Sequence, residues 1–115
     1  MKLLIEILSL RRPHRGRNEL FLAEGILTRL PGKLRVFNNT EGDPRAFVYT
    51  TDATSTTLFV AHLDTVHGED GHNPVIFDTE LDWLSKADGT PLGADNGAGV
   101  WLLYKMAEAS VPGTY

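Results

Sequence analysis

The sequence predicts an α/β domain in which helices cover a mixed sheet, an αβα sandwich. Apolar residues recur at helical spacing over the first thirty residues. The period then changes, and short alternating or wholly apolar stretches, typical of strands, follow between residues 33 and 84. A last helical stretch runs from about residue 97 to 109. A chain of 115 residues suits one domain.

Two helices are expected before the first strand. Helical spacing of leucine and isoleucine predicts a short helix over residues 2–10, which Pro13 and Gly16 close off. Asn18 is a candidate N-cap for a second helix over residues 19–30. The side of that helix expected to be buried carries Leu20, Ala23, Leu27 and Leu30.

Residues 33–37 and 46–50 alternate between apolar and polar and flank a segment rich in turn-forming residues. They are predicted to form an antiparallel pair. Residues 58–61 are continuously apolar, as expected of a central strand covered on both faces. Residues 74–77 and 81–84 are weaker strand candidates. The predicted last helix, residues 97–109, ends before Pro112-Gly113.

The composition excludes several classes of function. A net charge of −4 argues against a nucleic-acid surface, and no stretch approaches the roughly 20 apolar residues that cross a membrane. The chain has no cysteine, so it holds neither disulfides nor thiolate metal sites, and a cytoplasmic location is expected. One basic cluster comprises Arg11, Arg12, Arg15 and Arg17. The cluster could contact a phosphate or a carboxylate, but a solvated loop is the favoured interpretation.

The segment His62-Leu63-Asp64-Thr65-Val66 follows the predicted central strand and is the first candidate site. A strand end lies at the rim of a sheet, where open α/β sheets usually bind ligands. A metal-bound imidazole needs an acceptor for its second ring nitrogen, and Asp64, two residues on, could supply it. A core histidine bonded to a nearby aspartate would give the same pattern.

The segment Leu92-Gly93-Ala94-Asp95-Asn96-Gly97-Ala98-Gly99 precedes the last helix and is the second candidate site. Its small residues allow a metal ion to approach the backbone closely. A carboxylate has two oxygens and can bridge two cations. The alternative is that Asp95 or Asn96 only caps the helix.

In this order the two segments resemble the motifs of the co-catalytic di-zinc exopeptidases, a superfamily of aminopeptidases, dipeptidases and carboxypeptidase-like deacylases. The second segment, from Asp88 on, is most similar to aminoacyl-histidine dipeptidases and tripeptidases. The resemblance implies that His62 is a zinc ligand and Asp95 the bridging ligand, with a cis peptide bond after it. It places Asp64 in the catalytic machinery as the carboxylate that orients His62. It also implies an αβα sandwich of the zinc-exopeptidase type, with short peptides or acyl-amino acids as substrates.

The resemblance also implies a Glu-Glu pair, which supplies the general base and a ligand on the strand after the last helix. No Glu-Glu dipeptide occurs in the chain, whose residues 1–115 are expected to form the N-terminal portion of a catalytic domain incomplete at its C-terminus. Two zinc ions per complete site are expected, although cobalt or manganese would suit the same atoms. A non-catalytic α/β module, or half of a split enzyme completed by a second chain or in a homo-oligomer, remains an alternative.

Other polar residues are weaker candidates. His67 and His72, with Glu69 and Asp70, lie in one loop, where histidines are mostly solvated. His14 lies in the basic turn and has no partner in the sequence.

Overall fold

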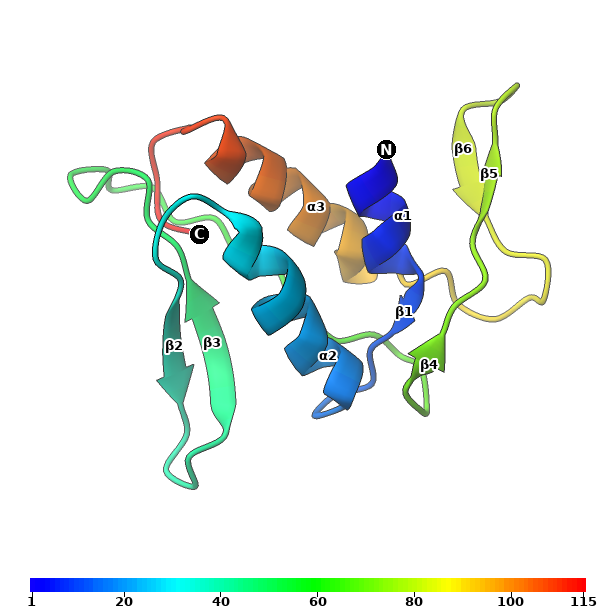
Figure 1. The fold of residues 1–115 in the computed structure, drawn as a ribbon, viewed down its shortest axis with the longest axis horizontal. Coiled ribbons are helices and arrows are strands. Elements are labelled where there is room, and N and C mark those ends of the chain that lie inside the picture. Colours follow the sequence, from blue (N-terminus) through cyan, green and yellow to red (C-terminus); the bar gives the residue numbers. More distant parts are fainter.

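Helices and small antiparallel sheets make up the computed structural model, which describes residues 1–115 (Figure 1). The helices are α1 (Lys2–Leu8), α2 (Arg17–Phe21) with its π and 3₁₀ continuations (Leu22–Ile26 and Leu27–Arg29), and α3 (Ala94–Glu108). The two-stranded sheets pair β1 (Leu10–Arg11) with β4 (Gly71–His72), β2 (Arg35–Asn38) with β3 (Pro44–Val48), and β5 (Ile76–Asp78) with β6 (Trp83–Ser85). The predicted α/β class is confirmed.

The core lies where α1, α3 and the second helical segment meet; this segment is α2 with its two continuations, residues 17–29. Ile7, Leu22, Ile26 and Val100 form one buried cluster there. A second cluster, Leu30, Tyr49, Tyr104 and Ala107, joins the far end of α3 to the β2–β3 hairpin. Gly97 allows α1 and α3 to approach, because a Cβ atom at this position would lie only 2.8 Å from Cδ2 of Leu8.

The second helix begins at Arg17 and is capped from a distant part of the chain. The Asp70 carboxylate accepts hydrogen bonds from the backbone N–H groups of Arg17 and Asn18, both at 2.8 Å. Asn18 itself donates to the carbonyls of Arg11 and Gly71. The prediction of Asn18 as the N-cap was therefore wrong, because a carboxylate 52 residues away occupies the free amides.

The strand predictions have mixed outcomes. The antiparallel pair is confirmed as β2–β3, with Arg35 opposite Val48, and the weaker candidates pair as β5–β6. The central strand over residues 58–61 was wrong: only Leu58 forms a bridge, to Thr114, and Val60 is 76% exposed. No single mixed sheet forms, because no strand lies beside this segment to complete a ladder.

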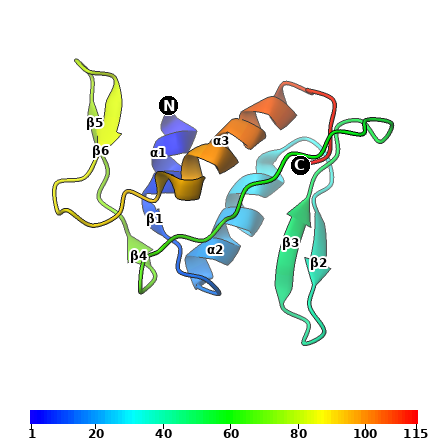
Figure 2. The same ribbon diagram turned by 180° about the vertical axis from the view of Figure 1, so that it is seen from behind.

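The segment after β3 nevertheless crosses the helical layer. Figure 2 shows it in green, running between α3 and α2 toward β4. Ala61 and Leu63 pack against the cluster around Val100. The segment thus carries residues 62–66 across the molecule to the start of α3. No helix in the fold combines the length and apolar character needed to cross a membrane.

A surface ion pair joins α1 to the end of the second helical segment. The two terminal guanidinium nitrogens of Arg29, Nη1 and Nη2, donate to the Glu6 carboxylate, at 2.8 and 2.6 Å. This hydrogen bonding lowers the pKa of Glu6 below its ordinary 4.5, although burial opposes the shift. The pair therefore stabilises the fold above about pH 4.5, and this contribution is lost as the pH falls through the lowered pKa.

We expect Glu6→Gln to reduce the free energy of unfolding at pH 7 by about 0.5–1 kcal/mol, the upper range for exposed pairs. The deficit should disappear once the pH lies below the pKa of Glu6 in the folded protein. Urea unfolding of the wild type and the variant across pH 2–7 measures the difference. Glu41→Gln, in an exposed turn with no ion pair, is the control. A deficit independent of pH would contradict this account.

Candidate functional site

The structure brings His62, Asp64 and Asp95 together. Nε2 of His62 lies 3.0 Å from Oδ1 of Asp95, and Nδ1 lies 3.1 Å from Oδ1 of Asp64. The side chain of Asp95 is 93% exposed and that of His62 is 50% exposed, so both are open to solvent. Two motifs separated by 33 residues therefore meet at one accessible point.

Both ring nitrogens of His62 face acceptors. Asp64 provides its carboxylate and its backbone carbonyl oxygen on the Nδ1 side. Burial lowers the pKa of His62, but hydrogen bonding to Asp95 and Asp64 outweighs it and leaves this pKa raised. The two carboxylates therefore favour the protonated, positively charged imidazole. A core histidine, the alternative from the sequence, would not be half exposed.

Asp95 departs from helical geometry at the start of α3. Gly93 precedes it with φ 78°, a left-handed conformation that suits glycine. Asp95 and Asn96 have non-helical backbone angles, and the peptide bond between them is cis, as the resemblance implies. No side chain caps the helix, and Asp95 bonds to His62 instead. The interpretation of Asp95 or Asn96 as a simple cap was therefore wrong.

Arg12 is a buried residue that connects the two backbone segments of the site. Its guanidinium is fully buried and donates to the carbonyls of Leu63 (2.7 Å) and Gly93 (3.2 Å). The same group also donates to the carbonyls of Ile7 and Leu10. One side chain thus fixes the backbone beside His62 to the backbone just before Asp95.

Burial lowers the pKa of Arg12 to about 10, although the nearby Asp64 charge opposes the shift. Arg12 therefore stays positive at neutral pH. The prediction that the basic cluster is a solvated loop was wrong for this residue, because four backbone carbonyls converge on it. No local pattern distinguishes Arg12 from its exposed neighbour Arg15, so this role could not be predicted from the sequence.

His67 supports the site from within and is not solvated. Its Nδ1 lies 2.6 Å from the Thr65 hydroxyl, and its Nε2 lies 3.0 Å from the Pro91 carbonyl oxygen. A carbonyl only accepts, so Nε2 carries the proton and the Thr65 hydroxyl donates to Nδ1. The expectation of a solvated histidine was wrong for His67, which is buried, whereas His72 is exposed on β4.

Asn73 anchors the loop before Asp95, a role the sequence did not reveal. Its side chain is fully buried and donates to the carbonyls of Leu8 and Leu92, at 2.9 and 3.0 Å. Lys86 donates to its amide oxygen and pairs with Asp88. Hydrogen bonds from Thr90, opposed by burial and aided by Lys86, lower the pKa of Asp88 to about 2. In the sequence, Asn73 lies between two strand candidates, residues 58–61 and 74–77, where an asparagine is usually solvated.

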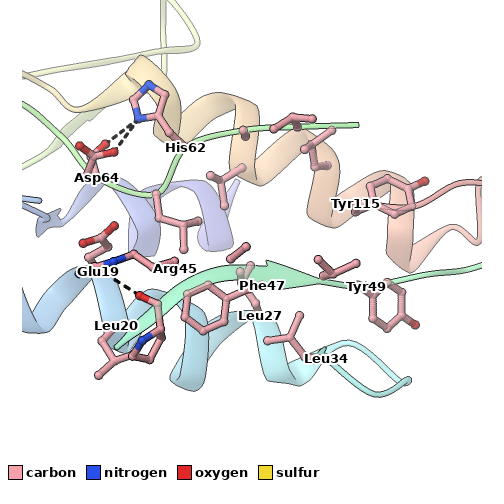
Figure 3. Close-up of a pocket in the computed structure, with 18 of the residues that line it drawn as sticks. Glu19, Leu20, Leu27, Leu34, Arg45, Phe47, Tyr49, His62, Asp64 and Tyr115 are labelled. Carbon is pink, nitrogen blue, oxygen red and sulfur yellow. Dashed lines mark hydrogen bonds and ion pairs between the residues drawn. The ribbon is translucent and has the colours of Figure 1, made fainter. Parts of the chain in front are cut away.

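A cavity of about 700 Å³ opens beside His62 and Asp64 (Figure 3). Most of its lining is apolar and comes from β3, the second helical segment, α3 and the segment over residues 58–64. Charged groups gather at one end, where Glu19 and Arg45 lie near Asp64, and Tyr49 and Tyr115 lie at the other. The candidate metal ligand His62 therefore borders a cavity large enough for a small apolar molecule.

Comparison of the chain with family models, curated proteins and solved structures gave no match in any of the three.

Proposed function

We propose that this chain carries part of the metal site of a zinc-dependent exopeptidase. His62 and Asp95 are its metal ligands, and Asp64 orients His62. One observation carries the proposal: the imidazole of His62 lies between two carboxylates, with Asp95 at Nε2 and Asp64 at Nδ1. The two segments that resemble the di-zinc exopeptidase motifs thus contact each other through His62 and Asp95. These residues are 33 positions apart, so their contact does not follow from local chain geometry.

The donor set fits a zinc ion. Imidazole nitrogen and carboxylate oxygen are ordinary zinc ligands, and a ligating histidine usually has its other nitrogen held by a carboxylate. The second oxygen of Asp95 makes no hydrogen bond, and its side chain is exposed, so it could serve a second ion. Cobalt or manganese would suit the same atoms.

The proposed reaction is hydrolysis of short peptides or acyl-amino acids. Zinc would supply the Lewis acid that polarises the scissile carbonyl and lowers the pKa of water. The chain's own residues prepare this chemistry: Asp64 fixes the ring of His62, and Arg12 fixes the two backbone segments that carry the ligands. Because the cavity beside His62 is mostly apolar, we expect the substrate to carry an apolar side chain that binds there.

The remaining ligands and the general base belong to the proposed complete site and are not assigned to residues of this chain. We also propose that this fold is part of an αβα sandwich of the zinc-exopeptidase type, whose mixed sheet residues 1–115 do not form by themselves.

Imidazole ¹⁵N NMR tests the proposal within one sample. Adding Zn²⁺ should move the Nε2 resonance of His62, while its Nδ1 keeps the character of an N–H that donates to Asp64. Exposed His72 is the internal control and should not move at stoichiometric zinc. Equal responses from His62 and His72, or metallation of His62 at Nδ1, would contradict the proposal.

A further inference from the structure

We propose a second divalent-cation site, formed by His14, Glu19 and Asp64 at the mouth of the cavity. One potential ligand atom from each residue lies within 4.8 Å of the other two. Nδ1 of His14 lies 3.8 Å from Oδ2 of Asp64. This oxygen is not the one that faces His62, so the two sites would use opposite sides of one carboxylate.

Backbone pairing brings the ligands together from distant parts of the sequence. The Arg12 N–H donates to the Thr65 hydroxyl at 3.0 Å, and the Thr65 N–H donates to the Arg12 carbonyl at 2.6 Å. His14 follows Arg12 by two residues and Asp64 precedes Thr65, so the pairing places these two side chains beside one another. Because Arg12 and Thr65 are both buried, this juxtaposition is built into the fold.

Glu19 approaches from α2. Its Oε2 accepts a hydrogen bond from the Arg15 N–H at 2.7 Å, which holds the carboxylate over the turn that carries His14. Its other oxygen, Oε1, has no hydrogen bond or ion pair. A carboxylate fixed at one oxygen and free at the other is suited to bind a cation.

The chemistry of the three groups favours a first-row divalent ion. Bond lengths of about 2.0–2.2 Å place two ligands of one ion roughly 3–4 Å apart, so His14 and Asp64 already stand at a coordinating separation. That separation exceeds a hydrogen bond. One imidazole and two carboxylates suit zinc, manganese or cobalt. All three residues line the cavity, so a cation could enter from solvent.

Co²⁺ titration, followed by calorimetry and visible absorption, tests the site. The double variant His14→Asn/Glu19→Gln should bind one Co²⁺ fewer than the wild type. His72→Asn/Glu69→Gln changes the same residue types at exposed positions outside both sites and should match the wild type. Circular dichroism confirms that each variant is folded.

A third variant separates this proposal from the proposed function. His62→Asn/Asp95→Asn should lose a different Co²⁺ equivalent and keep the one that depends on His14 and Glu19. Unchanged stoichiometry and affinity in His14→Asn/Glu19→Gln would overturn the second site and leave the exopeptidase proposal intact. If instead only His62→Asn/Asp95→Asn binds as the wild type does, the exopeptidase proposal fails and the second site stands.

Discussion

Replacing Arg12 by methionine is expected to lower the free energy of unfolding by about 2–6 kcal/mol, because backbone carbonyls lose their buried charged donor. Methionine fills much of the same space but donates no hydrogen bond. The carbonyls of Leu63 and Gly93 would lose their buried donor, as would those of Ile7 and Leu10. The carbonyls of Gly93 and Ile7 keep backbone N–H partners, whereas an acceptor left without a partner, such as the Leu63 carbonyl, costs about 1–3 kcal/mol.

Urea unfolding followed by circular dichroism measures this loss. Arg15→Met, at an exposed position in the same turn, is the matched control and should change stability by less than about 0.5 kcal/mol. A loss this small for Arg12→Met would show that Arg12 does not hold the two segments together. Should Arg12→Met prove too unstable to purify, Arg12→Lys keeps the charge and should show a smaller loss of the same sign.

The second large effect is expected on zinc affinity, when either proposed ligand is replaced. His62→Asn and Asp95→Asn should each weaken zinc binding at this site by at least about 100-fold, because each removes a direct ligand, whereas partners of a ligand typically contribute about 10–100-fold. Asp64→Asn, which removes the partner of His62 and keeps the ligand, should fall in that lower range. Competition with a chromophoric chelator measures all three.

His72→Asn is the control for nonspecific binding by surface histidines and should bind zinc as the wild type does. The order of the losses is itself informative. If Asp64→Asn lost as much affinity as His62→Asn, Asp64 would be acting as a direct ligand, and its assignment as an orienting residue would be wrong.

Local patterns predicted the secondary structure well where the residues that determine it lie within the same short segment. Helical spacing of leucine and isoleucine located α1, and alternation around a turn-rich loop located β2 and β3. In each case the residues that determine the structure lie within about a dozen positions of one another.

Predictions that depended on distant partners failed. The apolar residues 58–61 have the composition of a central strand, yet a strand needs neighbours, and here only Thr114 pairs with them. Asn18 has the chemistry of an N-cap, but the helix already begins at Arg17, and Asp70 accepts hydrogen bonds from the N–H groups of Arg17 and Asn18. No local pattern shows which of two suitable side chains reaches an amide first.

The candidate site divides in the same way. His62, Asp64 and Asp95 were singled out because the two segments that carry them resemble the metal-site motifs of the di-zinc exopeptidases, and the structure places their side chains together. Arg12 and Asn73, which hold the ligand segments in place, were missed because an arginine in a turn and an asparagine between strands are usually solvated. Their importance arises from burial among backbone carbonyls of distant segments, which sequence spacing does not encode.

The most direct test of the proposed metal site is a crystal structure of the zinc-soaked protein with anomalous diffraction data on both sides of the zinc absorption edge. The account predicts an anomalous peak about 2.0–2.2 Å from Nε2 of His62 and from a carboxylate oxygen of Asp95, with Asp64 still bonded to Nδ1 of His62. A fully soaked crystal with zinc bound elsewhere, and the His62–Asp95 hydrogen bond unchanged, would contradict it.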